Sequence, residues 1–135
     1  MSNLITVRVL NISYLDTLYQ LEVDFCGNRI ILIGLKNDKN IKIDSKLKLS
    51  IPSSAIFLIK ELDIEINNYL NLLEATILDI EFGKILDGVR LKICNREIYT
   101  LISSKIFKKL NLNIGDRVVV ALKETQIDIV EVFCD

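Results

Sequence analysis

The 135-residue sequence predicts an all-β protein made of two similar modules in tandem, with one short helix in the second module. Three observations predict this: apolar and polar residues alternate along many short segments, turn-forming residues separate those segments, and the pattern repeats within the chain. Half of the residues are hydrophobic, so a chain of this length can bury a substantial core. We expect a folded chain of short strands, arranged as a sandwich or a small barrel.

The predicted strands are half-buried, because alternation with a period of two gives each strand one apolar face. The clearest cover residues 6–9, 21–25, 89–93 and 127–132. Turn-forming pairs lie between such segments at Gly27-Asn28, Asn37-Asp38, Asp87-Gly88 and Gly115-Asp116. These pairs predict the ends of the strands.

One short helix is predicted over residues 104–110. Ser103 is a suitable N-cap, and Ile106, Phe107 and Leu110 fall on one side of the helix. A second amphipathic stretch, 59–70, is a weaker helix candidate because its apolar residues alternate. We interpret it as the segment that connects the two modules.

An internal repeat defines the modules. An offset of 68 positions (71 − 3) aligns Asn3-Leu4 with Asn71-Leu72 and Cys26 with Cys94, with the hydrophobic pattern in phase. Further on, an offset of 71 (125 − 54) aligns 51–56 with 122–127, so the first copy is about three residues shorter where the second has its helix. We predict a first module at 1–62, a connector at 63–70 and a second module at 71–135. The alternative is two unrelated β meanders of similar spacing.

Composition excludes several classes of function. The net charge of −1 gives no electrostatic reason to expect nucleic acid or an anionic membrane as a partner. Charged residues interrupt every apolar run well before the ~20 residues that a spanning helix needs, so membrane insertion is not expected. Residues 1–4 lead into strand-like sequence without the features of a signal peptide, which predicts a cytoplasmic protein.

Catalysis is not expected either. The chain contains no histidine, which removes Ser-His-Asp and Cys-His nucleophile systems, H-E-x-x-H metalloprotease sites and the two-His-one-carboxylate iron site. Neither nucleotide-binding glycine motif is present. The three cysteines are odd in number and form no C-x-x-C pair, so we expect reduced, mostly buried thiols and no metal held by protein ligands.

The second copy, 71–132, resembles the Mop domain, also called the TOBE domain, a family of intracellular molybdate-binding modules. The matching segments are Asn71-Leu72-Leu73-Glu74-Ala75-Thr76-Ile77 for the family's opening N-x-L-x-G-T-V run, Ile80-Glu81-Phe82-Gly83 for its I-x-x-G turn, 101–103 for V-I-T, 110–116 for L-G-L-x-x-G-D, and Leu122-Lys123-Glu124-Thr125 for I-K-A-T. The first copy matches less closely. Nearly the whole chain is also similar to the C-terminal regulatory region of molybdate-importer ATPase subunits.

The resemblance implies an OB-like five-stranded barrel for each module and oxyanion sites at interfaces between modules or subunits. It implies binding of molybdate or tungstate for storage, homeostasis or sensing, with a molybdopterin species as a further ligand. It also implies a homo-oligomer, either a dimer or a trimer, and a molybdate-transporter ATPase as a partner.

Donor groups define the candidate site, because molybdate is a dianion that offers no protons at neutral pH. A helix N-terminus supplies free N–H groups, which points to the start of the predicted helix, and Lys123 and Thr125, two apart on a predicted strand, share a face. The oxyanion-binding candidates are Lys123, Ser103, Thr125, Asn71, Asn68, Tyr69, Leu70, Ser104 and Lys105, with first-module counterparts Ser2, Asn3, Ser53 and Ser54.

Each candidate also has a structural interpretation. Ser103 serves as a helix cap, Lys105 as part of a solvated helix face, Lys123 as a charge that protects an edge strand, and Asn71 as a residue that fixes the chain at the start of the barrel. The family's S-A-R-N motif reads 68–71 here, with Asn68 in place of serine and Leu70 in place of arginine. A charged ligand is therefore missing.

Two other functions stay open. The first is a protein–protein assembly module whose anion site has decayed, consistent with the missing arginine. The second is an OB-type domain that binds single-stranded nucleic acid, which would require stacked aromatic residues and a basic groove. Neither feature is evident, since the tyrosines are scattered and acidic residues intersperse with basic ones.

Overall fold

The structure is a computed structural model that describes residues 2–36, 39–60 and 71–133. Its elements are β1 (Ser2–Leu15), β2 (Leu18–Phe25), β3 (Asn28–Leu35), β4 (Lys46–Pro52), the 3₁₀ turn η1 (Ser53–Ala55), β5 (Ile56–Ile59), β6 (Asn71–Glu81), β7 (Leu86–Ile93), β8 (Arg96–Ser103), the helix α2 (Ser104–Leu110), β9 (Arg117–Leu122), the 3₁₀ turn η2 (Glu124–Gln126) and β10 (Asp128–Val132). The predicted connector, 63–70, lies outside the described residues.

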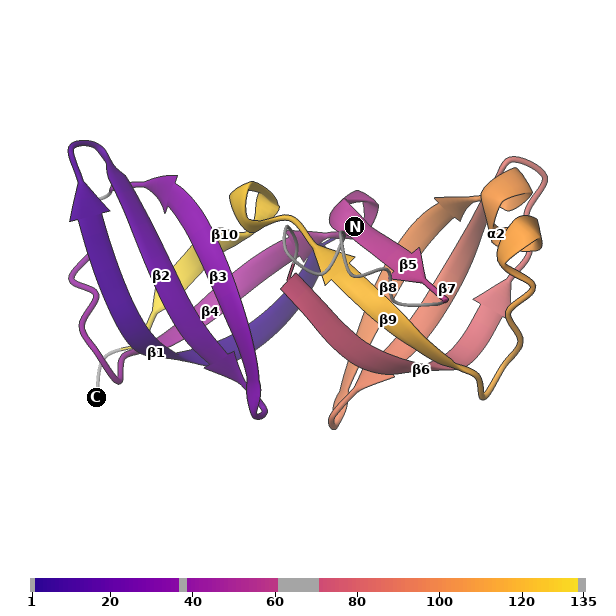
Figure 1. The fold of residues 1–135 in the computed structure, drawn as a ribbon, viewed down its shortest axis with the longest axis horizontal. Helices are drawn as coiled ribbons and strands as arrows, with labels where there is room; N and C mark the ends of the chain where they lie inside the picture. Colours follow the sequence, from indigo (N-terminus) through magenta and orange to yellow (C-terminus); the bar gives the residue numbers. More distant parts are fainter. Residues whose placement is uncertain (1, 37–38, 61–70, 134–135) are drawn as a thin grey trace.

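The strands form two curled five-stranded sheets that lie side by side along the long axis (Figure 1). The first sheet has the order β10-β4-β1-β2-β3 and the second has the order β5-β9-β6-β7-β8. All pairs are antiparallel. Within the described residues α2 is the one α-helix, and it covers an end of the second sheet. The predicted fold class, all-β with two OB-like five-stranded modules and one short helix, is confirmed.

Each sheet takes one strand from the other half of the chain. β5 follows β4 in sequence but pairs with β9 of the second sheet, with Ile56 opposite Leu122. β10 follows β9 but pairs with β4 of the first sheet, with Asp128 opposite Ser50. The predicted module boundaries follow the repeat in sequence, whereas sheet membership crosses them at these two strands. The chain therefore passes between the sheets twice, at η1 and at η2.

The core follows the predicted alternation. In β1, Ile5, Val7 and Val9 are buried and the residues between them are exposed. In α2 only Phe107 is buried, while Ile106 is about half exposed, so the predicted apolar side of the helix is narrower than expected. No helix in the described part of the chain has the length and apolar character needed to cross a bilayer.

The turn predictions had different outcomes. The turns predicted at Gly27-Asn28 and Gly115-Asp116 each lie one residue earlier, at Cys26-Gly27 and Ile114-Gly115. The turn predicted at Asp87-Gly88 is wrong, because both residues lie inside β7 and Gly88 pairs with Leu101. Glycine fits there because a side chain on Gly88 would collide with the Tyr99 ring. Asn37-Asp38 lies outside the described residues.

The cysteine prediction is wrong for two of the three residues. Cys26 and Cys94 are both exposed and form a disulfide. Each begins a two-residue hairpin turn with positive φ, 54° at Cys26 and 58° at Cys94, and the two hairpin tips meet between the sheets (Figure 1). The two residues are 68 apart in sequence, and a cross-link closing a loop of that length stabilises the fold by about 4 kcal/mol in the chain-entropy description. Cys134 lies outside the described residues.

Candidate functional site

The two points at which the chain passes between the sheets, η1 and η2, both lie in the central part of the molecule (Figure 1). Leu122, the last residue of β9, pairs on one side with Ile56, which follows η1, and on the other with Asn71 at the start of β6. The turn η2 follows Leu122 after one residue. We call this region, comprising Ser2, Asn3, η1, Asn71, Lys123 and η2, the crossover.

Two buried asparagines hold the crossover together. Asn71 accepts a hydrogen bond from the backbone N–H of Ile31 through Oδ1 (2.9 Å) and donates from Nδ2 to the carbonyl of the same residue (2.8 Å). Asn3 makes the equivalent pair with Tyr99, at 2.7 Å and 2.8 Å, and also donates to the carbonyl of Ile51. Each side-chain amide thereby bonds to both the N–H and the C=O of one strand residue, as the backbone of a neighbouring strand would.

Each amide bonds to one residue of an edge strand. Ile31 lies on β3 and Tyr99 on β8, and each of these strands is an edge of its sheet. An unpaired edge presents free N–H and C=O groups to solvent and to other chains. The structure therefore gives both Asn3 and Asn71 a structural role, which differs from the role at the start of the barrel foreseen for Asn71 alone. Direct contact with an oxyanion stays a prediction for both.

Several donor groups at the crossover are exposed. Lys123, Thr125, Ser54 and Ser2 all reach solvent, whereas Ser53 is buried and its carbonyl accepts a hydrogen bond from the Thr100 hydroxyl at 3.0 Å. Within the described residues, Lys123 has no ion-pair partner among the four ion pairs found, all of which lie elsewhere on the surface. Its ammonium group is therefore free to meet an anion.

The predicted shared face of Lys123 and Thr125 is wrong in its geometry. β9 ends at Leu122, Lys123 precedes the 3₁₀ turn, and Thr125 lies within that turn, where Gln126 N–H donates to the Lys123 carbonyl (3.1 Å). Strand alternation therefore does not apply to these residues, and Glu124 begins the turn directly after the lysine. Sequence alone did not distinguish a continuing strand from this short turn.

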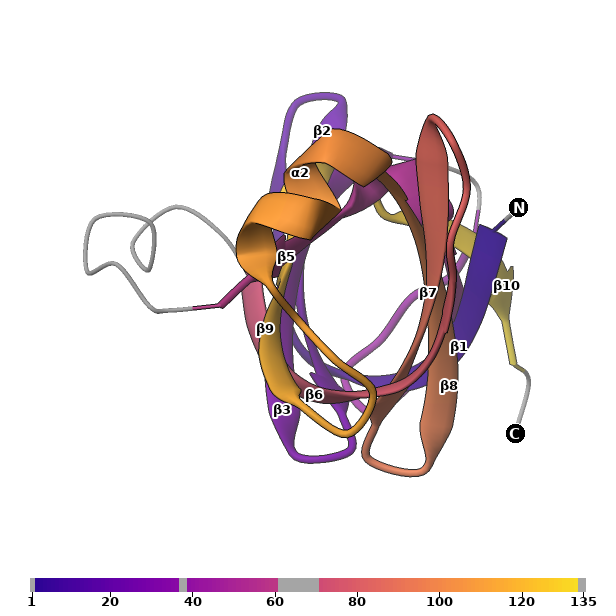
Figure 2. The same ribbon diagram turned by 90° about the vertical axis from the view of Figure 1, so that its right-hand side faces the viewer.

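The residues predicted at the helix start lie elsewhere. α2 occupies an outer end of the second sheet, away from the crossover (Figures 1 and 2). Ser103 is the N-cap by position but makes no side-chain capping bond. The Ser104 N–H donates to the Ile85 carbonyl at 2.8 Å, so that backbone donor is already used. The structure therefore brings Ser103, Ser104 and Lys105 together with one another but not with Lys123.

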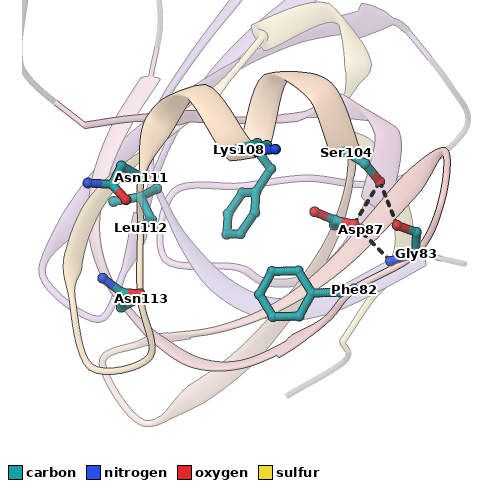
Figure 3. Close-up of a pocket in the computed structure, with 9 residues that line it drawn as sticks. Phe82, Gly83, Asp87, Ser104, Lys108, Asn111, Leu112 and Asn113 are labelled. Carbon is teal, nitrogen blue, oxygen red and sulfur yellow. Dashed lines mark hydrogen bonds between the residues drawn. The ribbon is translucent and has the colours of Figure 1, made fainter.

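A pocket of about 400 Å³ lies beneath α2, and an acidic residue that was read as part of a turn lines it (Figure 3). Asp87 is 3% exposed, and its Oδ1 accepts hydrogen bonds from the Gly83 N–H (2.9 Å) and the Ser104 hydroxyl (2.7 Å). This carboxylate would repel a dianion. The pocket is thus a poor oxyanion site, in contrast to the crossover. Of the remaining candidates, Asn68, Tyr69 and Leu70 lie outside the described residues.

One titratable side chain in the first sheet is perturbed. Tyr19 is 6% exposed and packs over Gly34. Burial raises the pKa of its phenol above the usual value of 10.0, and the nearby negative charge of Asp128 raises it further. Because Asp128 is on β10, this interaction connects the first sheet to the strand it receives from the second half of the chain.

Together, the fold and the crossover define a class of protein: paired OB-like β modules that exchange one strand and present hydroxyl and ammonium donors where the exchange occurs. No family model and no curated protein sequence matches the chain. The chain is similar in structure to ModG, described as a cytoplasmic molybdate-binding protein and solved with molybdate bound, with a TM-score of 0.84, 94% of each chain covered and 13% sequence identity. At this identity the similarity establishes a shared fold.

Proposed function

We propose that the protein binds molybdate or tungstate at the crossover, as a storage, homeostasis or sensing protein without catalytic activity. The observation that carries this proposal is the exposed Lys123 ammonium, which has no ion-pair partner in the described part of the chain and follows directly on Leu122, the residue opposite Ile56. The turn η2, with the exposed Thr125, follows Lys123, and the turn η1, with the exposed Ser54, precedes Ile56. The fold shared with a molybdate-binding protein along 94% of both chains supports it.

The chemistry of the crossover suits a tetrahedral oxyanion. The four oxygens of molybdate accept hydrogen bonds, and charge-assisted bonds from an ammonium group are stronger than those between neutral groups. Hydroxyls can donate to the remaining oxygens because their hydrogens rotate freely. Glu124, half-buried in the same turn, opposes the lysine charge, so we expect weaker binding than a site with a second cation would give.

The proposal extends to the surroundings of the protein. We place it in the cytoplasm, the location described for ModG, and as a homo-oligomer, dimer or trimer, in which a second subunit adds donors to the open side of the crossover. A molybdopterin species as a further ligand and a molybdate-transporter ATPase as a partner follow from the family resemblance alone.

The test is the thermal midpoint of the purified protein with molybdate, tungstate, sulfate and phosphate in parallel. A ligand at ~100 times its dissociation constant adds about 2.7 kcal/mol of stability, which raises the midpoint by several degrees. We expect stabilisation by molybdate and tungstate only. Lys123→Gln should remove most of it, whereas Lys109→Gln, which removes an equal charge from the exposed face of α2, should leave it intact.

Absence of any anion-dependent shift at millimolar concentration would refute this function. It would favour the second candidate, an assembly module, which rests on exposed apolar side chains at both outer ends of the molecule. These are Tyr14, Leu15, Leu18 and Leu35 on the first module and Phe82, Ile85, Leu86 and Ile106 on the second. The assembly module predicts an oligomer, measured by light scattering, whose size is independent of every anion tested.

A further inference from the structure

A second cationic site lies on the outer face of the second sheet, apart from the crossover. It is a pocket of about 290 Å³ lined by Glu74, Ala75, Thr76, Lys92, Cys94 and Arg117, which we call the basic pocket. Three of these residues form a row across neighbouring strands, because Thr76 on β6 pairs with Lys92 on β7 and with Arg117 on β9. Two cations therefore flank one hydroxyl.

The charges of the basic pocket favour a small anion. In the part of the chain that the structure describes, neither Lys92 nor Arg117 forms an ion pair. Glu74 is the single carboxylate in the lining, so the pocket carries one net positive charge. Lys92 and Glu74 are exposed, which leaves the pocket open to solutes from solvent.

One wall of the pocket carries half of the disulfide. Cys94 lines it and is bonded to Cys26 of the other module, whereas Cys26 is not among the lining residues. Both cysteines are exposed at hairpin tips. Accessible disulfides are generally the labile ones, and thiol–disulfide exchange requires a thiolate to reach one of the two sulfurs. An anionic solute in the basic pocket would lie against the exposed Cys94 residue.

We propose that the basic pocket receives a small thiol bearing a carboxylate, and that this thiol opens the Cys26–Cys94 disulfide by attacking Cys94. Lys92 and Arg117 bind the carboxylate and stabilise the attacking thiolate. Cys26 and Cys94 thus act as a reversible clamp between the two hairpin tips. After it opens, the strand exchange at β5 and β10 still joins the modules, so the molecule loosens without separating.

The thiol–disulfide exchange proceeds in two steps, in which atoms and electrons balance. In the first, the thiolate sulfur bonds to Cys94 Sγ, the Cys94–Cys26 bond breaks, and Cys26 leaves as a thiolate that takes up a proton. In the second, another thiolate attacks the external sulfur of the mixed disulfide, and Cys94 leaves as a thiolate. Two small thiols are oxidised to one small disulfide, and the protein disulfide is reduced to two thiols by the same two electrons.

The first experiment counts free thiols. Alkylation of the unfolded chain without reductant should modify one of the three cysteines, and alkylation after reduction should modify all three. Peptide mapping without reduction should find the Cys26 and Cys94 peptides joined. Modification of all three cysteines in protein that has never met a reductant would overturn the proposal.

The second experiment measures how the rate of reduction depends on the charge of the thiol. The probes are 3-mercaptopropionate, 2-mercaptoethanol and cysteamine, which are similar in size and carry negative, zero and positive charge. Dividing each rate by the rate of the same thiol with the urea-unfolded chain removes intrinsic reactivity. We expect the largest ratio for 3-mercaptopropionate, and a loss of that advantage at high salt, because salt screens the two cations.

Variants locate the effect. Lys92→Gln and Arg117→Gln should each lower the 3-mercaptopropionate ratio about three- to tenfold, within the range of electrostatic effects on association, and leave the 2-mercaptoethanol ratio unchanged. Glu74→Gln should raise the 3-mercaptopropionate ratio, and Lys109→Gln, on the distant helix, should leave it unchanged. Equal ratios for the three thiols would refute the proposal that the basic pocket binds the anionic thiol. An equal fall in the ratios of charged and neutral thiols in the variants would refute it too.

The third experiment identifies the sulfur that is attacked. Acid quenching early in the reaction traps the mixed disulfide, and peptide mapping then shows which cysteine carries 3-mercaptopropionate. We expect the adduct on Cys94. An adduct mainly on Cys26, or one divided equally between the two cysteines, would show that the basic pocket does not direct the thiol.

Discussion

At the scale of single residues, burial gives one tyrosine a specific effect on stability. The pKa of Tyr19 is raised in the folded protein by burial and then by Asp128, so the folded state holds the phenol proton more tightly than the unfolded chain does. Below about pH 10 both states keep the proton and the residue has no pH-dependent effect. As pH rises above that value the unfolded chain ionises first, and the free energy of unfolding falls.

We therefore expect Tyr19→Phe to reduce the loss of stability above pH 10. Urea unfolding at several pH values between 8 and 11 measures it, on the assumption that other groups contribute equally to both proteins. Tyr14→Phe is the matched control, because the Tyr14 ring is half exposed and lies on the adjacent strand. Equal alkaline slopes for wild type and Tyr19→Phe would contradict the prediction.

At the scale of the elements, the asparagine amides connect a strand of one module to the edge strand of the other. In Asn71→Ala the N–H and C=O of Ile31 lose both partners, and a polar group that is left unsatisfied where water is excluded costs about 1–3 kcal/mol. Urea unfolding should show a loss of that size. Asn113→Ala, which removes an exposed amide with no hydrogen bond of its own in the described structure, should change stability by less than about 0.5 kcal/mol.

The predictions for the elements succeeded where burial alone decides the pattern. Alternation identified β1, β2 and β7 because each has one face in the core, and the helix bounds followed from its N-cap position and periodicity. Asp87-Gly88 was mistaken for a turn because the contact that requires glycine there comes from Tyr99, on another strand. Likewise, no local signal shows that the chain turns in 3₁₀ form immediately after Lys123.

At the scale of the whole molecule, neither half of the chain can complete a sheet alone. Fragment 1–62 lacks β10, and fragment 71–135 lacks β5. We expect each fragment alone to be largely unfolded by circular dichroism, and an equimolar mixture under oxidising conditions to regain the β spectrum. Cooperative unfolding of either fragment by itself would show that the exchanged strands are dispensable.

The exchange of strands between the sheets could not be predicted from the sequence, because alternation shows which face of a strand is buried but not which strand lies beside it. The disulfide was missed for a related reason. The repeat aligned Cys26 with Cys94, but only the arrangement of the modules shows that equivalent hairpins meet. Among the candidate binding residues, the sequence grouped Lys123 with Ser103, which lies at the start of the distant helix α2. Ser54 was assigned to the first module, whereas its turn η1 leads into β5, which pairs with β9 just before Lys123.

The paired asparagines and the paired cysteines have a further consequence. All of these contacts obey the same 68-residue shift. It relates Asn3 to Asn71 and their respective partners Tyr99 and Ile31, so the two asparagine contacts are equivalent. It also relates Cys26 to Cys94, so the disulfide joins two equivalent residues. A symmetric dimer of single modules would have the same contacts, with one cysteine bonded to its own symmetry mate. In such a dimer, assembly would depend on protein concentration. Fusing the two copies into one chain replaces that dependence with an effective concentration set by the connector, on the millimolar scale, so that the paired state survives dilution.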